Sequence, residues 1–184
     1  MLKELVIYSN LLKHISLPEN LVILDASHNK LVTMPMINEL TSLQTLRVDH
    51  NLLTFLPDIY KLRNLIVLDI SANDLSIIPE DIGLLCRLET LNAEHNKLKS
   101  IPTSIKWTLN LKKLIIYNNR LTEIPDLGDL KNLEVLDISY NKSTEIPSGI
   151  NSYSLPNLSE FSCEYNKFIH MPDLTNFPNL VKKF

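Results

Sequence analysis

Glycine is scarce in this chain of 184 residues. Only three glycines occur, at Gly83, Gly128 and Gly149, against roughly thirteen expected from the average usage of about 7%. No two of them are close enough to form a glycine-rich phosphate loop, which needs clustered glycines so that the backbone can approach phosphate oxygens. The sequence therefore excludes the nucleotide-binding enzymes that depend on such loops.

Cysteine and long hydrophobic runs are scarce as well. Cys86 and Cys163 are 77 positions apart and form no CxxC or CxxH motif, so we expect two reduced thiols and no disulfide framework. No apolar run approaches the roughly 18 residues of a membrane span, and the run at residues 5–8 is too short for a signal peptide. The sequence thus predicts a cytoplasmic, intracellular protein with no membrane partner.

An excess of basic residues is also missing. The chain has 21 acidic residues and 18 lysines and arginines, which gives a formal net charge of −3. A protein that binds nucleic acid needs a basic face to neutralise the phosphates. We therefore predict no nucleic-acid partner.

What the sequence does contain is a repeat. The segment LVILDASHN from Leu21 returns as LQTLRVDHN from Leu43 and as LIVLDISAN from Leu65. The copies start near residues 2, 21, 43, 65, 88, 111, 133 and 158, with a partial copy from 180. Each of the eight copies ends in an asparagine, at Asn10, Asn29, Asn51, Asn73, Asn96, Asn119, Asn141 and Asn166. A repeat period of roughly 20–50 residues predicts a solenoid, so residues 1–184 are predicted to form one domain.

The pattern inside each copy predicts a short strand followed by a turn. Side chains alternate across a strand, so the residues at the fourth and sixth positions, such as Leu68 and Ile70, face a shared interior. The closing asparagine can bond to backbone groups of its own and of adjacent repeats. The three-residue spacing of Pro79, Ile82 and Leu85 suits a short 3₁₀ turn in the return segment.

The pattern LxxLxLxxNxL, followed by an ending in LxxIP, resembles the leucine-rich repeat family over residues 2–180. The resemblance implies an α/β, curved leucine-rich repeat solenoid of about eight repeats. Its parallel sheet would line the concave side, and short 3₁₀ or irregular turns would line the convex side. Repeats of 22–23 residues look like the intracellular Ras-suppressor-type subgroup.

Candidates for catalysis or metal binding are few. His28, His50 and His95 share the position before the asparagine, and His28 and His50 lie in adjacent copies. These two are close enough to share a metal ion, with Asp49 or Asp25 as a third ligand. Polar residues at the end of a strand usually face solvent, however, so we predict no metal site and no cofactor. No nucleophile, base and orienting residue occur together, and we predict that the chain is not an enzyme.

The concave face is expected to carry the partner-binding residues, because its side chains are free of core packing. Eight acidic and two basic residues are expected there, and such a surface attracts a basic protein. The alternative is that the aspartates belong to the LDxS pattern common in the family and only keep this face soluble. The charged part of the predicted site consists of Asp25, Arg47, Asp49, Asp69, Glu94 and Asp137.

A second part of the predicted site is hydrophobic. Three consecutive copies place apolar and aromatic residues on or beside the concave sheet: Ile115, Tyr117, Val135, Tyr140 and Tyr165. Exposed aromatic residues beside aliphatic ones are typical of the hot spots of protein interfaces. The alternative is that Tyr140 and Tyr165 only shield the edge of the asparagine ladder.

These observations predict a non-enzymatic module that binds a protein partner through its concave face in intracellular signalling or regulation. By resemblance, the partner is a small GTPase, a kinase or a phosphatase catalytic subunit. Two alternatives stay open: the recognition part or regulatory subunit of a larger enzyme complex, and a fragment of an extracellular ligand-binding receptor. We expect a monomer, with end-to-end association as the alternative because neither end repeat has a polar cap.

Overall fold

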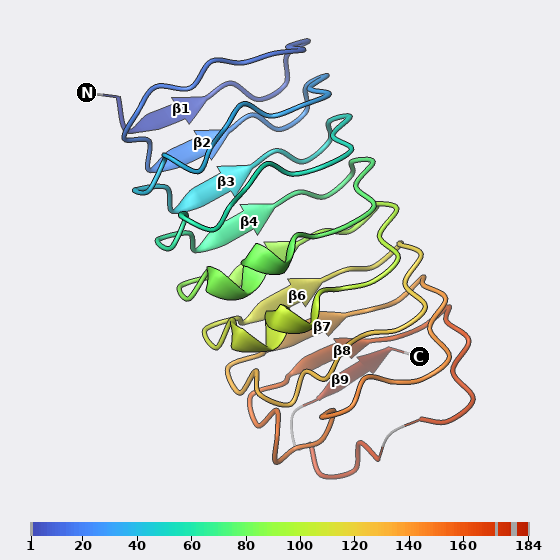
Figure 1. The fold of residues 1–184 in the computed structure, drawn as a ribbon. Helices are drawn as coiled ribbons and strands as arrows, with labels where there is room; N and C mark the ends of the chain where they lie inside the picture. Colours follow the sequence, from blue (N-terminus) through green and yellow to red (C-terminus); the bar gives the residue numbers. More distant parts are fainter. Residues whose placement is uncertain (1, 172, 178–179, 184) are drawn as a thin grey trace.

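The computed structural model describes residues 2–171, 173–177 and 180–183. Over these residues the chain forms a solenoid whose strands stack in chain order as one parallel sheet (Figure 1). The strands are β1 (Glu4–Val6), β2 (Ile23–Asp25), β3 (Thr45–Arg47), β4 (Val67–Asp69), β5 (Thr90–Asn92), β6 (Lys113–Ile115), β7 (Val135–Asp137), β8 (Glu160–Ser162) and β9 (Val181–Lys183). The predicted parallel-strand solenoid is confirmed.

The register of the sheet aligns the same position of every repeat. Leu24 pairs with Leu46, and Leu46 with Leu68. These central residues are fully buried, whereas the residues on either side of them in each strand are partly exposed. The fourth-position residues therefore form a continuous interior column, as the alternation predicts.

The register of the last strand, β9, is shifted by one residue from the register that the repeat numbering predicts. A copy counted from Leu180 puts Lys183 in the fourth position, but the pairing of β9 with β8 puts Lys182 opposite Phe161. The repeat between β8 and β9 is therefore one residue shorter than the repeat count indicates.

A ladder of buried asparagine side chains joins each repeat to the one before it. The Asn73 amide group donates to the carbonyl of Val48 in the preceding repeat at 3.0 Å, and its oxygen accepts from the N–H of Leu53 at 2.9 Å. The same amide donates to the carbonyls of Ile70 and Ser71 in its own repeat. This pattern recurs from Asn29 to Asn166, so the chain turns inward with its backbone polar groups satisfied.

A second set of asparagines connects the repeats on the outside. Each residue of this set directly precedes the first leucine of a copy, is partly or fully exposed, and donates to a backbone carbonyl of the preceding repeat at 2.7–2.9 Å. The set consists of Asn64, Asn110, Asn132 and Asn157. This set was not among the predicted features, although the recurring dipeptide Asn-Leu marks it in the sequence.

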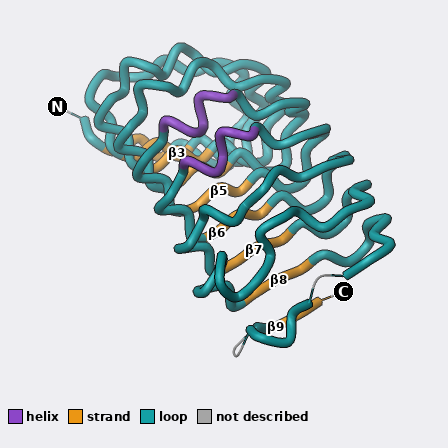
Figure 2. The backbone as a smooth tube through the Cα atoms, turned by 60° about the horizontal axis from the view of Figure 1, so that its bottom comes forward, coloured by secondary structure: helices purple, strands orange, loops and turns teal. Residues whose placement is uncertain are grey.

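Two 3₁₀ helices lie on the side of the solenoid opposite the strands (Figure 2). These are η1 (Glu80–Leu84) and η2 (Thr103–Trp107), and each begins directly after a proline. The predicted 3₁₀ turn between Pro79 and Leu85 is therefore confirmed. Gly83 of η1 packs so closely on η2 that an added Cβ would lie 2.7 Å from Ser104, which explains a glycine at this position.

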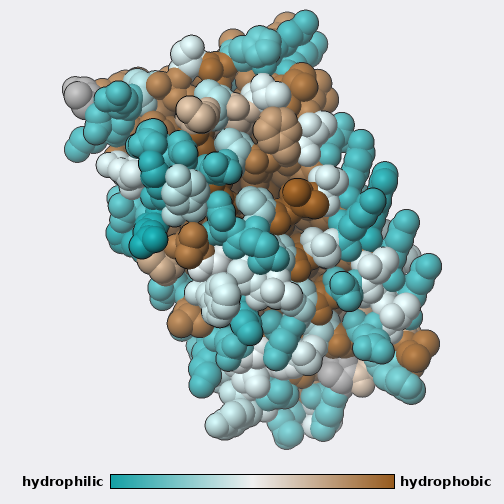
Figure 3. Space-filling model, viewed as in Figure 1, coloured by the Kyte–Doolittle hydropathy of each residue, from teal (hydrophilic) through white to brown (hydrophobic). Residues whose placement is uncertain are grey.

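The side of the solenoid that carries η1 and η2 exposes several large hydrophobic residues, including Leu84 and Trp107. Figure 3 shows hydrophobic side chains along the length of this face, between hydrophilic ones. Among the residues that the structure describes, no helix is long and apolar enough to cross a membrane.

A column of left-handed backbone precedes the asparagine ladder. Residues with φ between +47° and +54° occur at one point of each repeat: Ser9, His28, His50, Ala72, His95, Asn118, Tyr140 and Tyr165. Residues other than glycine and asparagine rarely adopt this conformation, and it costs roughly 1–2 kcal/mol. The inward turn imposes this conformation. The N–H of the left-handed residue and the N–H of the residue after it both bond to carbonyls of the next repeat, as at His50 and Asn51.

The seventh repeat interrupts the core with a serine. Leu121 and Phe168 lie two residues after their ladder asparagines, and Ser143 takes that place after Asn141. Ser143 is fully buried, and its Oγ has no hydrogen-bond partner among the described residues. A buried hydroxyl without a partner destabilises the folded state.

We expect Asn73→Ala to lower the free energy of unfolding by about 1–3 kcal/mol, because the buried N–H of Leu53 loses its partner. Urea denaturation followed by circular dichroism measures the change. Asn132→Ala is the matched control, since it removes an exposed amide that donates to Leu109, and it should cost less than about 1 kcal/mol. Equal losses in the two variants would contradict a special role for the buried ladder.

We expect Ser143→Ala to raise the free energy of unfolding by about 1 kcal/mol, because it removes a buried hydroxyl without a partner. Ser104→Ala is the control: Ser104 is also buried, but its Oγ donates to the carbonyl of Glu80 at 2.7 Å. That variant should lose about 1 kcal/mol. Thermal and urea unfolding of both variants test the opposite signs, and a destabilised Ser143→Ala would contradict the expectation.

Candidate functional site

The first and last residues of each strand, which are the third and fifth positions of the repeat, lie on the concave face. Much of the charged part of the predicted site lies at these positions. Arg47 ends β3 and lies in register between Asp25 of β2 and Asp69 of β4. Asp25 and Asp69 are half-buried, whereas Arg47 is exposed. The sheet thus places one cation between two carboxylates, in three adjacent repeats.

Three of the concave aspartates bond to a serine of their own repeat. The Oδ1 atom of Asp25 accepts from the hydroxyl of Ser27 at 2.5 Å and from its N–H at 3.1 Å. Asp69 accepts in the same way from Ser71, and Asp137 from Ser139. The LDxS pattern therefore has a structural role at the end of the strand, and each aspartate keeps its second oxygen for other contacts.

Glu94 lies on the same face between two of these aspartates. Burial raises the pKa of its carboxyl above the usual value, and the charges of Asp69 and Asp137 raise it further, while His95 and a hydrogen bond involving Asn92 lower it. The pKa is raised because the ionised form is poorly hydrated and repelled by like charges. The concave face therefore holds Glu94 at a cost in stability when the carboxyl is charged.

The hydrophobic part of the predicted site forms an aromatic row, which consists of His95, Tyr117, Tyr140 and Tyr165. Tyr140 and Tyr165 stack with their ring centroids 4.2 Å apart, and Tyr117 meets Tyr140 edge to face at 6.0 Å. At the other end the hydroxyl of Tyr117 bonds to Nε2 of His95, and the two rings meet at 4.6 Å. The row spans four repeats at the end of the strands.

The sequence analysis named three of the four residues in this row. It did not include His95, because nothing in the repeat pattern shows that Tyr117 leans back toward the preceding repeat. Ile115 in β6 and Val135 in β7 lie on the sheet as half-buried residues. Ile115 is two residues before Tyr117 on the same side of the chain, so the aliphatic and aromatic residues form one surface.

Tyr117 is the least accessible ring of the row. Tyr165 is 68% exposed and Tyr140 43% exposed, whereas Tyr117 is half-buried. Burial raises the pKa of the Tyr117 and Tyr140 hydroxyls, and nearby carboxylates add to the effect at both. Both hydroxyls are therefore neutral hydrogen-bond donors at neutral pH.

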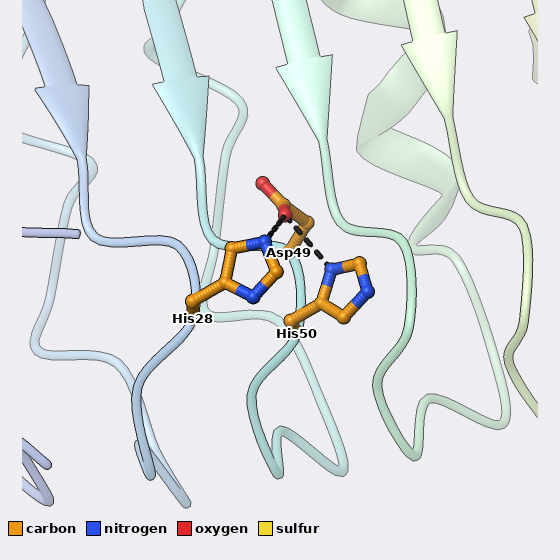
Figure 4. A group of neighbouring side chains, drawn as sticks. All are labelled: His28, Asp49 and His50. Carbon is orange, nitrogen blue, oxygen red and sulfur yellow. Dashed lines mark hydrogen bonds and ion pairs between the residues drawn. The ribbon is translucent and has the colours of Figure 1, made fainter. Parts of the chain in front are cut away.

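A second cluster of side chains lies after β2 and β3. His28, Asp49 and His50 point toward one another there (Figure 4). Oδ2 of Asp49 lies 3.0 Å from Nδ1 of His50 and 3.7 Å from Nε2 of His28. The two imidazole rings stack with centroids 4.1 Å apart and planes at 15°. The structure thus brings together the two histidines and Asp49, while Asp25 bonds to Ser27.

The repeats match known protein families. A leucine-rich repeat model matches residues 41–98, and a second leucine-rich repeat model, of two copies, matches residues 109–152. Together the two matches cover more than half of the chain. The chain is a leucine-rich repeat protein.

Three solved structures show how similar this leucine-rich repeat protein is to others. A leucine-rich repeat protein of Leptospira interrogans, LIC12759, is 33% identical over 90% of the chain, with a TM-score of 0.82. YopM, a leucine-rich effector protein from Yersinia pestis, is 28% identical over 98% of the chain, with a TM-score of 0.83. The ectodomain of the receptor kinase GASSHO1/SCHENGEN3 from Arabidopsis thaliana is 28% identical over 88%, with a TM-score of 0.78.

The leucine-rich repeat protein spans less than half of each of these structures. It covers 43% of the Leptospira chain, 48% of YopM and 21% of the plant ectodomain. A comparison with curated proteins found no match.

A groove of about 380 Å³ lies away from the aromatic row, between the return segments of two late repeats of the leucine-rich repeat protein. Much of its lining is aliphatic, and includes Ile146, Ile150, Ile169 and Met171. Such a lining suits hydrophobic contact better than acid–base chemistry, which needs convergent titratable groups.

Both cysteines of the leucine-rich repeat protein are free thiols. Cys86 is exposed and Cys163 is buried. Burial, with help from Glu164 and Asp137, raises the pKa of the Cys163 thiol to about 11. Since the thiolate is the reactive form, Cys163 acts as a small hydrophobic core residue.

We expect Glu94→Gln to stabilise the leucine-rich repeat protein at pH 7. A raised carboxyl pKa means that the folded state binds the proton more tightly than the unfolded state, so stability falls as the pH rises through the two pKa values. The substitution removes this cost at neutral pH, and the advantage should vanish in acid, where both states carry the proton. Urea unfolding at a series of pH values measures it.

Glu123→Gln is the control for the change in net charge, because Glu123 is an exposed residue outside the concave face. If both variants show the same pH dependence of stability, net charge rather than the burial of Glu94 is the cause.

Proposed function

We propose that this leucine-rich repeat protein is a non-enzymatic module that binds a protein partner through its concave face and the adjoining aromatic row. The observation that carries the proposal is the row itself. Four rings, each in contact with the next and three of them exposed, extend over the repeats that also carry the half-buried Ile115 and Val135. Aromatic residues dominate the binding energy of protein interfaces because they bury a large area with little loss of side-chain freedom.

The similar structures support a binding function. The plant ectodomain was solved in complex with Casparian strip integrity factor 2, and YopM is described as an effector protein. Leucine-rich repeat folds generally present one curved surface to a protein partner. We extend this mode of binding to the present chain.

The charges on the concave face support a basic partner. Asp25, Asp69 and Asp137 place three carboxyl groups on this face, each bonded to a serine, and Glu94 lies among them. Like charges on one surface raise the association rate of an oppositely charged protein at low salt. The partner proposed here therefore contacts the aromatic row with apolar groups and the acidic strands with basic ones.

The finer parts of the proposal concern location and process. The two free cysteines and the LxxIP endings support an intracellular regulatory protein of the Ras-suppressor type. The receptor fragment and the regulatory subunit of a larger complex stay as alternatives, since one of the similar structures is an ectodomain. A monomer stays the predicted state.

The double variant Tyr140→Asn and Tyr165→Asn tests the proposal. Both residues have φ near +54°, and asparagine tolerates this left-handed backbone, so the rings are removed without straining the turn. Tyr153→Asn is the control, because Tyr153 is exposed but lies outside the row. Wild type and variants are immobilised, exposed to host-cell lysate, and their retained proteins are compared by quantitative mass spectrometry.

We expect at least one protein to be retained by wild type and by Tyr153→Asn and to be lost from the double variant. Truncation of a hot-spot aromatic typically costs about 2 kcal/mol or more, so the loss should be at least roughly 30-fold in affinity. Retention of the same proteins by all three forms would show that the aromatic row is not the binding site.

A further inference from the structure

We propose that His28, Asp49 and His50 form a binding site for a divalent transition-metal ion, best suited to zinc. The ligand atoms of these three side chains lie within 4.8 Å of one another. Within the described part of the chain, no other group of three His, Cys, Asp or Glu residues converges in this way. The site lies after β2 and β3, whereas the aromatic row begins at His95, two repeats after His50.

The distances between the ligand atoms fit a small ion. Zinc lies about 2.0–2.2 Å from histidine nitrogen and carboxylate oxygen, so two ligands of a tetrahedral ion are roughly 3.3–3.5 Å apart. Oδ2 of Asp49 is 3.0 Å from Nδ1 of His50 and 3.7 Å from Nε2 of His28. The two distances bracket the required value.

The backbone holds the two histidines in fixed positions. Both have a φ of +50° or +51°. The N–H of His28 donates to the carbonyl of Asp49 at 2.9 Å, and the N–H of His50 to the carbonyl of Ser71 at 3.0 Å. The same hydrogen bonds keep the two histidines one repeat apart.

The three side chains differ in their freedom to move, because Asp49 is largely buried and the two histidines are exposed. The side chain of Asp49 is only 14% exposed, whereas those of His28 and His50 are 53% and 55% exposed. In the stacked arrangement the two rings lie in nearly parallel planes, and an ion must lie near the plane of each ring that binds it. Binding therefore requires a rotation of the rings, which their exposure permits.

The surrounding charges favour a cation. Arg47 is the nearby basic residue in the sheet, and it lies in register between Asp25 and Asp69. Together with Asp49 these residues leave an excess of negative charge beside the histidines. Asp25 does not belong to the convergent group, and its Oδ1 accepts from the hydroxyl and the N–H of Ser27.

The ligand types select the metal. Two imidazoles and one carboxylate suit zinc and similar transition metals, whereas magnesium and calcium prefer an all-oxygen shell and copper(I) prefers sulfur. Three protein ligands leave one tetrahedral position open. That position faces solvent beside the exposed rings and accepts water or a side chain from another protein.

Calorimetric titration of the metal-free full chain with zinc chloride tests the proposal. We expect one zinc ion per chain in wild type and no binding of magnesium under the same conditions. His28→Asn, His50→Asn and Asp49→Asn should each weaken zinc binding by roughly 100-fold or more, since loss of outer-shell partners alone costs about 10–100-fold. Asparagine is chosen because it tolerates the left-handed backbone at both histidines.

His95→Asn is the matched control. His95 has the same position in its repeat and the same φ of +51°, but its ring contacts Tyr117 and Asn118 rather than a carboxylate. This variant should bind zinc as wild type does. Absence of zinc binding by wild type would overturn the proposal, and so would equal binding by all four variants.

A measurement on wild type alone covers the case of a variant that does not fold. Zinc added to isotopically labelled protein should shift the ring resonances of His28 and His50 and leave those of His14 in place. Coordination through Nε2 of His28 and Nδ1 of His50 should appear in the nitrogen shifts of the two rings. Shifts at other residues without shifts at these two would also overturn the proposal.

Discussion

The buried asparagine ladder is the constraint on which the rest of the molecule depends. Each amide group binds backbone atoms of two repeats at once, so it sets both the inward turn after the strand and the distance to the neighbouring repeat. Because every repeat obeys the same rule, equivalent side chains follow one another at strand spacing. The stacked Tyr140 and Tyr165 and the stacked His28 and His50 are both results of this spacing.

Much of the architecture could be predicted from the sequence, because the repeat imposes the same physics at each copy. The column of Leu24, Leu46 and Leu68, the ladder asparagines and the 3₁₀ turn after Pro79 follow from periodicity and from the needs of buried polar groups. The register of β9 did not follow from the periodicity. In a degraded copy, the pairing with β8 decides the alignment rather than the repeat count.

The candidate sites were predictable only as columns of residues. A repeat pattern shows which side chains are one strand apart, but not how each rotates about its own bonds. His95 joins the aromatic row because Tyr117 leans toward the preceding repeat. Asp49 meets the histidines, whereas Asp25 bonds to the serine two residues later. The outer asparagines, such as Asn64, were missed because the repeat pattern gives no reason to expect polar contacts on the exposed side.

The left-handed column before the ladder limits how this surface can evolve. Its eight members include serine, histidine, alanine, asparagine and tyrosine, and none is β-branched. Valine, isoleucine and threonine are the residues least compatible with a positive φ, so selection against strain filters them out at every repeat. Among the remaining amino acids, a mutation changes what the surface displays and leaves the turn intact. Single substitutions along this column can therefore change the displayed side chains, within the smaller set of amino acids that the backbone tolerates.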